Sequence, residues 1–203
     1  MKGRVLKSTG SWYQVELEDG RHLPCRIKGK FRLDGIKHTN PISVGDVVSI
    51  ELEAGTDNGV IKAIDERRNY IIRKSNNLSK QTQLIASNLD QAFLVVTLAF
   101  PKTSLGFIDR FLLTAEAYHI PAILVFNKQD LVLDELADYQ EQVIAMYEKI
   151  GYTCLKVSAR TGEGMGGLKA LLQGKTSLFS GHSGVGKSSL LNAIEPGLGV
   201  KTA

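Results

Sequence analysis

A glycine-rich segment near the end of the chain is the feature that most constrains its fold. Residues 181–188 read GHSGVGKS and match the pattern G-x-x-x-x-G-K-[ST] in full. In this pattern glycines let backbone N–H groups curl around a phosphate, the lysine reaches the outer phosphates, and the hydroxyl binds Mg²⁺. An apolar run precedes the segment and a helical pattern follows it. The sequence therefore predicts a phosphate-binding loop between a strand and a helix whose positive N-terminus faces the phosphate.

The phosphate site takes in nine consecutive residues. Lys187 is the candidate catalytic residue because its ammonium offsets charge on the phosphates, and the hydroxyl of Ser188 is the candidate Mg²⁺ ligand. At the variable second position of the loop we expect a tolerated side chain that has no catalytic role. The phosphate-site residues are Gly181, His182, Ser183, Gly184, Val185, Gly186, Lys187, Ser188 and Ser189.

Strand and helix patterns alternate in the residues before this loop. Continuous apolar runs predict buried strands, and apolar residues at helical spacing predict the helices that cover them. We therefore expect residues 89–203 to form an α/β domain with a mainly parallel sheet covered on both faces. The expected strands are near residues 91–98, 121–127, 153–157 and 175–180, and the expected helices are near 108–115, 134–149, 166–172 and after 187.

The first part of the chain has a different pattern. Five short runs of β-type residues, near residues 3–6, 12–17, 22–27, 44–52 and 60–64, are separated by turn signals such as Asp19-Gly20 and Asn58-Gly59. They predict a small closed β-barrel over residues 1–66, for which an OB-fold is the best match. Residues 67–88 are polar, and we interpret them as the connection between the two domains.

A second motif identifies the base of the nucleotide. Asn127, Lys128 and Asp130 directly follow an apolar run, in the N-K-x-D pattern of guanine-nucleotide-binding proteins. A carboxylate at this place can accept hydrogen bonds from guanine N1–H and from its 2-amino group, which adenine does not offer. The lysine stem can cover one face of the base, and Asn127 is placed to tie this loop to the phosphate loop. Asp130 is therefore the candidate specificity residue.

Ser158 and Ala159, in the stretch VSARTGEG, follow the next expected strand. They resemble the S-A-[KR] turn whose backbone N–H meets guanine O6. A Ser-Ala turn is common after a strand, so its position behind N-K-x-D is what makes it a candidate.

The order of these motifs is unusual. In a Ras-like GTPase the phosphate loop comes first, whereas here N-K-x-D and S-A precede it, so the sequence resembles a circularly permuted GTPase. Strand ends of a doubly wound sheet meet at one crevice, so the same pocket can form in either order. The permuted order, the small barrel, GHSGVGKSSLLNAI and LVFNKQDL are together similar to the ribosome small-subunit-dependent GTPase A family.

That resemblance implies several properties of the protein. Proteins of that family combine an OB-fold, a permuted GTPase domain and a C-terminal zinc-binding domain. They act in late maturation of the small ribosomal subunit, and the subunit stimulates their GTP hydrolysis. GTP or GDP and Mg²⁺ are the implied ligands, and the subunit with its rRNA is the implied partner. No D-x-x-G occurs in the 203 residues. We therefore expect the switch segments and the zinc ligands beyond Ala203, and interpret the sequence as a truncated, incomplete piece that binds nucleotide but hydrolyses GTP poorly.

The densest basic segment lies in the expected barrel, at residues 21–38, in a chain whose formal net charge is +4. Arg26, Lys28, Lys30 and Arg32 are the candidate RNA-binding residues, since such a patch can follow a phosphate backbone. The alternative is a solvated rim of the barrel. The family resemblance favours RNA contact.

The composition bounds the remaining possibilities. The apolar runs are too short to cross a bilayer and the N-terminus has no secretory pattern, so we expect a cytoplasmic monomer without a membrane partner. Cys25 and Cys154 lack the paired spacing of a zinc site and are expected to be buried thiols. Two alternatives to a GTP-binding protein stay open: a P-loop ATPase or kinase, and an RNA-binding module with a vestigial nucleotide site.

Overall fold

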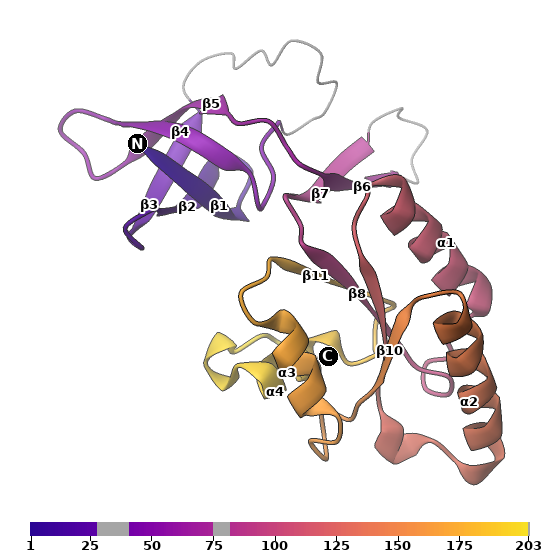
Figure 1. Cartoon of the computed structure of the whole chain (residues 1–203). Helices are drawn as coiled ribbons and strands as arrows, with labels where there is room; N and C mark the ends of the chain where they lie inside the picture. Colours follow the sequence, from indigo (N-terminus) through magenta and orange to yellow (C-terminus); the bar gives the residue numbers. More distant parts are fainter. Residues whose placement is uncertain (28–40, 75–81, 203) are drawn as a thin grey trace. The chain divides into compact units, whose positions relative to one another are not determined.

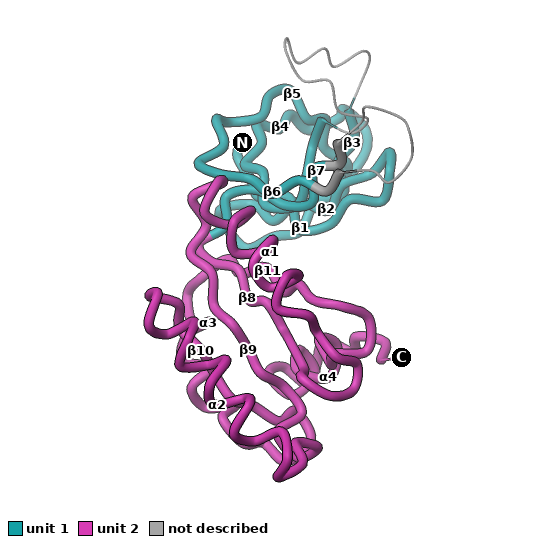
Figure 2. Tube along the Cα trace, turned by 90° about the vertical axis from the view of Figure 1, so that its right-hand side faces the viewer, with its two compact units in different colours: residues 1–89 teal, residues 90–203 magenta. Residues whose placement is uncertain are grey.

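The computed structural model describes residues 1–27, 41–74 and 82–202 of the chain. The chain divides into two compact units, Met1–Leu89 and Asp90–Ala203, which are coloured separately in Figure 2. Each unit is described by itself below. None of the helices in the described ranges combines the length and the apolar character needed to span a bilayer.

The first unit contains a closed five-stranded barrel (Figure 1). Its strands pair in the order β1-β2-β3-β5-β4 and back to β1. The β3–β5 pair is parallel and the other pairs are antiparallel. This is the OB-fold that the sequence predicts. The strands are β1 (Lys2–Ser8), β2 (Trp12–Leu17), β3 (His22–Ile27), β4 (Val47–Leu52) and β5 (Gly59–Ile64).

Alternation along the strands builds the barrel core. On β2, Tyr13, Val15 and Leu17 are buried, whereas the residues between them lie toward solvent. Because successive side chains of a strand point to opposite faces, this period of two places one face of each strand inside the barrel. Cys25 and Val5 add to the same core from the neighbouring strands.

A two-stranded antiparallel hairpin follows the barrel, formed by β6 (Tyr70–Lys74) and β7 (Thr82–Ser87). It lies within residues 67–88, whose polar composition predicts a connection between the two domains. One carboxylate joins the hairpin to the barrel: Asp46 accepts hydrogen bonds from the guanidinium of Arg67 and from Ser87 Oγ. The hairpin is therefore fixed to the loop that leads into β4.

The second unit contains a four-stranded sheet in the order β10-β9-β8-β11, in which every pair is parallel. Four helices accompany it, together with short 3₁₀ turns at Gln129–Leu131 and Pro196–Leu198. The strands are β8 (Gln91–Val96), β9 (Ala122–Phe126), β10 (Thr153–Lys156) and β11 (Ser177–Ser180); the helices are α1 (Leu105–Ala117), α2 (Asp134–Lys149), α3 (Met165–Leu172) and α4 (Lys187–Ile194).

The two faces of this sheet have separate cores. Leu94 and Val96 of β8 pack with residues of α1 and α2, and the intervening Phe93 and Val95 pack with residues of α3 and α4. Figure 1 shows the two helix pairs on opposite faces of the sheet. Burial on both faces explains why β8 reads as an uninterrupted apolar run, the pattern from which the sequence predicts a covered parallel sheet.

Candidate nucleotide-binding site

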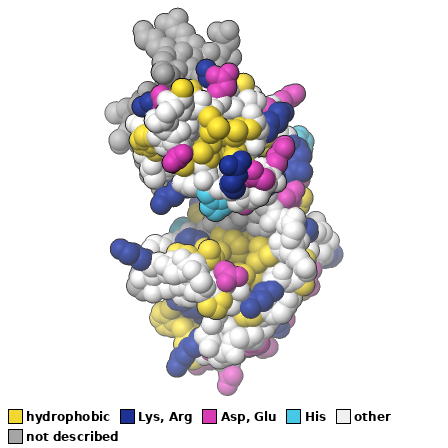
Figure 3. Space-filling model, turned by 90° about the vertical axis from the view of Figure 1, so that its left-hand side faces the viewer, with side chains coloured by type: hydrophobic (Ala, Val, Ile, Leu, Met, Phe, Trp, Pro, Cys, Tyr) yellow, Lys and Arg dark blue, Asp and Glu magenta, His cyan; other side chains and the backbone are white. Residues whose placement is uncertain are grey.

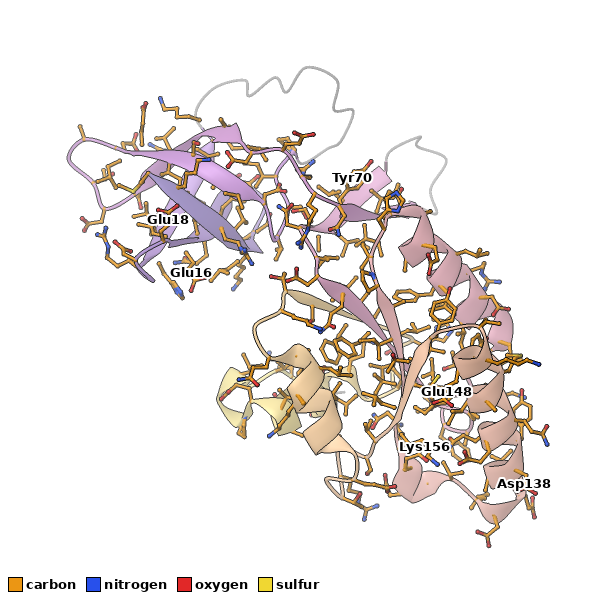
Figure 4. The ribbon with its side chains drawn as sticks, viewed as in Figure 1. Glu16, Glu18, Tyr70, Asp138, Glu148 and Lys156 are labelled. Carbon is orange, nitrogen blue, oxygen red and sulfur yellow. The ribbon has the colours of Figure 1, made fainter. Side chains whose placement is uncertain are left out.

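The predicted site residues lie at the carboxyl end of the parallel sheet. The phosphate loop follows β11, Asn127 follows β9, and Ser158 comes two residues after Lys156, which ends β10 and is labelled in Figure 4. Because all these strands run in the same direction, the loops after them meet at one edge of the sheet.

The phosphate loop has a backbone that depends on its glycines. Gly181 and Gly186 have φ angles of +142° and +96°, values that residues with a Cβ rarely adopt. A Cβ at Gly181 would overlap the carbonyl oxygen of Val95, and one at Gly186 would overlap the side-chain amide of Asn127. The loop is therefore packed closely against β8 and against the loop after β9.

Several donors in this loop are free to face a ligand. Among the hydrogen bonds of the described residues, none uses a backbone N–H of residues 183–186. Helix α4 begins directly after them, at Lys187, and its first N–H groups have no acceptor within the helix. Such a run of amides with the positive end of a helix dipole suits an anion.

The ammonium of Lys187 lies across the loop. Its Nζ donates to the carbonyl oxygens of Gly181, at 2.9 Å, and His182, at 2.7 Å. These bonds hold the charge at the start of the phosphate loop. The imidazole of His182 stacks on the ring of Phe107, with ring centroids 3.9 Å apart, so it packs against the first turn of α1.

Asn127 joins the three loops of the site. Its Nδ2 donates to Val185 O in the phosphate loop at 2.8 Å, and its Oδ1 accepts from Ala159 N, in the loop after β10, at 3.4 Å. The residue is only 4% exposed. A buried amide that bridges these loops fixes the distance between a phosphate position and a base position.

The carboxylate of Asp130 has a defined orientation. Its Oδ1 accepts from Ser158 Oγ at 2.6 Å, and that oxygen accepts in turn from Thr161 N at 3.2 Å. The guanidinium of Arg160 lies 3.7 Å from Oδ2. The Asp130 side chain is 14% exposed, so its remaining lone pairs face a partly dehydrated space.

Lys128 has a left-handed backbone, with φ of +65°. Its Nζ donates to Phe100 O at 2.7 Å, which extends the stem along the loop after β8. Together with Phe100 and Leu131 it lines a shallow hollow. The stem is thus anchored at its end beside this hollow, and its methylene groups offer an apolar surface to a planar base.

The described residues offer no cluster of three or more His, Cys, Asp or Glu side chains able to hold a metal ion. Ser188 stands in the first turn of α4, behind the lysine of the phosphate loop. Mg²⁺ commonly takes one or two protein ligands together with phosphate oxygens and waters, so this hydroxyl fits a nucleotide-borne Mg²⁺.

Burial disfavours the thiolate form of both cysteines. Burial raises the pKa of the Cys25 thiol to about 11 and that of the Cys154 thiol to about 12. Both thiols are therefore protonated at neutral pH, whereas a metal ligand has to be a thiolate.

Of the candidate RNA-binding residues, the structure describes Arg26; Lys28, Lys30 and Arg32 lie outside the described residues. Arg26 Nη2 lies 2.6 and 2.7 Å from the two carboxylate oxygens of Glu53, and its guanidinium lies 5.8 Å from the centre of the Trp12 ring. Figure 3 shows Lys and Arg side chains interspersed with Asp and Glu on the visible barrel face. Arg26 therefore already has an anionic partner.

Three residues outside the predicted motif positions help to shape the site. Phe107 packs on His182, and Gln129 forms a reciprocal amide pair with Gln140 of α2. A signal for Gln140 exists in the sequence: it precedes Val143, Ile144 and Tyr147 at the spacing of one helix face, as a polar residue in an apolar stripe. Phe107 has no such signal.

Fold and site together define a class of protein: a circularly permuted GTPase domain that follows an OB-fold barrel. The pattern described as RsgA GTPase matches residues 64–203, and the pattern described as RsgA N-terminal domain matches residues 2–61. The chain belongs to the RsgA GTPase family.

Relatives cover the whole chain. It is 55% identical over 204 residues to a small ribosomal subunit biogenesis GTPase RsgA of Bacteroides fragilis and 57% identical over 206 residues to one of Christiangramia forsetii. These alignments span 100% of the chain but 65% of each relative, so the chain corresponds to about two thirds of their length.

Two solved structures are similar in fold. YjeQ from Thermotoga maritima superposes with a TM-score of 0.79 at 38% identity, over 100% of this chain and 67% of that one. YloQ, described as a circularly permuted GTPase, gives a TM-score of 0.72 at 35% identity, over 98% of this chain and 66% of that one. The permuted order expected from the motifs is thus the order of the family.

Proposed function

We propose that this chain binds GTP and GDP, and that the intact protein hydrolyses GTP while it assists maturation of the small ribosomal subunit. The observation that carries the proposal is the bridge made by Asn127. It joins a loop suited to phosphate to a loop whose carboxylate suits guanine. The relatives' names, small ribosomal subunit biogenesis GTPase, support the cellular role.

Each site residue has a proposed part in nucleotide binding. The amides of residues 183–186 and the ammonium of Lys187 hold the phosphates, while Asp130 accepts hydrogen bonds from guanine N1–H and the 2-amino group. The stem of Lys128 covers the base. The donor we assign to guanine O6 is Ala159 N–H, which would share its hydrogen between the nucleotide and Asn127 Oδ1, an acceptor that lies 3.4 Å away.

The reaction we propose for the intact protein is phosphoryl transfer to water. Lys187 stabilises charge that develops on the phosphate oxygens, which makes it the one catalytic residue we assign in this chain. Ser188 would hold a Mg²⁺ ion that arrives with the nucleotide, and the ion supplies further charge stabilisation on the phosphates.

Competition tests this function against a P-loop ATPase or kinase. We expect excess unlabelled GTP to displace fluorescent GDP from the purified protein and a thousandfold excess of ATP to leave it bound, because adenine cannot donate to Asp130 at two places. Displacement by ATP at concentrations similar to GTP would favour the ATPase or kinase. If calorimetry detects no binding of GDP with Mg²⁺, the chain is an RNA-binding module with a vestigial site.

The barrel is the part of the chain for which we propose rRNA contact. One support is its OB-fold, a fold that commonly binds oligonucleotides in other proteins. The other is the basic segment that begins in β3. Within the described residues Arg26 is paired with Glu53, so a phosphate has to compete with that carboxylate. The other three candidates carry the larger part of this proposal.

We expect the variant with Arg26, Lys28, Lys30 and Arg32 all changed to Ala to bind small subunits more weakly and with a flatter dependence on salt. Each lost phosphate contact lowers the slope of log K against log salt by about 0.7 to 0.9. Sedimentation with subunits at several salt concentrations measures the slope. Lys2→Ala with Lys62→Ala provides a control, since these exposed cations pair with Asp65 and Glu51 outside the basic segment. An unaltered slope in the fourfold variant would mean that the segment is a solvated rim.

A further inference from the structure

The residue between Lys128 and Asp130 carries a side chain that points away from the nucleotide site. Gln140 Nε2 donates to Gln129 Oε1 at 2.8 Å, and Gln129 Nε2 donates to Gln140 Oε1 at 3.3 Å. Gln129 Nε2 also donates to the carbonyl of Phe126, the last residue of β9, at 3.0 Å. The carboxamide of Gln129 therefore connects the strand before the base-reading loop with the helix after it.

Gln140 stands where packing alone favours an apolar residue. It is 4% exposed and shares the buried stripe of α2 with Val143, Ile144 and Tyr147. A buried carboxamide is costly unless its donors and acceptor are bonded, whereas Leu or Met would fill such a position without that requirement. The hydrogen-bond partner of Gln140 is Gln129, which lies in the base-reading loop.

The backbone of the loop is also fixed at Gln129. Its N–H donates to Val157 O at 3.2 Å, and its carbonyl accepts from Val132 N at 3.2 Å. The preceding residue, Lys128, holds a left-handed conformation that a lysine keeps only where its surroundings impose it. Gln129 is thus the anchored point of a constrained turn.

Asp130 directly follows this anchored residue. Two hydrogen bonds to guanine N1–H and the 2-amino group require its carboxylate to lie close to the plane of the base. A small displacement of the turn moves this carboxylate and weakens both bonds, although the phosphate loop stays in place. We propose that Gln129 and Gln140 are positioning residues for the base-reading carboxylate of Asp130, an inference that rests on the proposed guanine-nucleotide function.

The test compares GDP with IDP, whose base lacks only the 2-amino group, in the full-length protein. We expect the wild type to prefer GDP over IDP by on the order of tenfold to a hundredfold, the effect of one charge-assisted hydrogen bond. Gln140→Met keeps the side-chain length but removes the amide. We expect the GDP-to-IDP affinity ratio to fall at least about threefold in this variant, because the loss of one anchoring hydrogen-bond pair displaces the turn.

Two further variants separate positioning from general destabilisation. Gln129→Met removes the same pair and also the bond to Phe126 O, so it should lower the ratio at least as much as Gln140→Met. The double variant should fall no further than Gln129→Met. Gln142→Met makes the same change at an exposed position of α2 and should leave the ratio unchanged. A variant that is merely less stable loses affinity for GDP and IDP equally, so the ratio reports on positioning alone.

The outcomes for the two proposals differ. A wild type that does not prefer GDP over IDP overturns the proposed function and the positioning role together. If the wild type prefers GDP and either folded variant, Gln140→Met or Gln129→Met, keeps the full ratio, only the positioning role is overturned.

Discussion

Asp130→Asn is expected to reverse the preference of the nucleotide site from guanine to xanthine. Ser158 Oγ already accepts from Thr161 N and so donates to residue 130, which directs the asparagine carbonyl toward Ser158 and its amide toward the base. An amide N–H₂ opposite guanine N1–H and the 2-amino group loses both bonds. At about 1.5 to 3 kcal/mol for each charge-assisted bond the cost is on the order of 3 to 6 kcal/mol. GDP should therefore bind about a hundred- to ten-thousandfold more weakly.

Xanthine has a carbonyl in place of the 2-amino group, so the new amide can donate to it and XDP should gain affinity. Titration of both proteins with fluorescent GDP and XDP measures the reversal. Asp134→Asn makes the same change at the exposed start of α2 and should leave both affinities as they are. Loss of all nucleotide binding would indicate a damaged fold, whereas a variant that still prefers GDP would show that Asp130 does not read the base.

Periodicity was sufficient to predict most of the fold. The apolar run ending at Val96 and the helical stripe containing Ile108 and Leu112 have one-dimensional signatures, and the structure places them as β8 and α1. Alternation on β2 likewise predicts a strand with one buried face. These patterns can be read from the sequence because the buried face of a strand or helix requires apolar residues at the spacing of that element.

The hairpin β6–β7 shows where this reasoning stops. Its residues include many polar ones, and the apolar Ile71 and Ile72 form too short a run to define a period. Pairing between the two strands, and the bonds from Ser87 to Asp46, come from contacts distant in sequence. The polar composition of residues 67–88 therefore predicted a connection only. In the structure, pairing between residues distant in sequence makes part of this segment a hairpin.

The site divides in the same way. The placement of Gly181, Lys187 and Asp130 at one edge of the sheet was predictable because motifs carry both residue type and spacing, and parallel strands bring their loops together. The supporting contacts were not: the stacking of Phe107 on His182 joins residues 75 positions apart, and the amide pair joins Gln129 to a helix face. A motif specifies the groups that meet the ligand, whereas the groups that hold them depend on the packing of a particular chain.

The pocket of this site does not depend on the order in which its motifs occur along the chain. Asn127 contacts Val185 across 58 positions of sequence, yet the bond needs only that β9 and β11 run parallel in one sheet. The positions of strand ends, and not the order in which the chain visits them, determine the pocket. The bridge from Asn127 is therefore expected to form in either chain order.

The carboxylate of Asp46 is expected to contribute strongly to the stability of the first unit. It is fully buried and accepts from both Arg67 Nε and Nη2 at 2.7 Å, from Ser87 Oγ at 2.5 Å and from Ser43 N at 2.8 Å. These bonds join the loop before β4, the segment before β6 and the end of β7. Its side chain therefore connects three separate stretches of chain by charge-assisted bonds.

Asp46→Ala should lower the free energy of unfolding of this unit by about 3 to 5 kcal/mol, because it leaves the Arg67 guanidinium, 13% exposed, as an uncompensated buried charge. Trp12, the single tryptophan of the chain, lies on β2, so its fluorescence during urea unfolding reports on this unit. Glu51→Ala on β4 removes an exposed partner of Lys62 and should change the midpoint little. Equal midpoint shifts in the two variants would contradict the role of Asp46, since a surface pair and a buried one would then contribute alike.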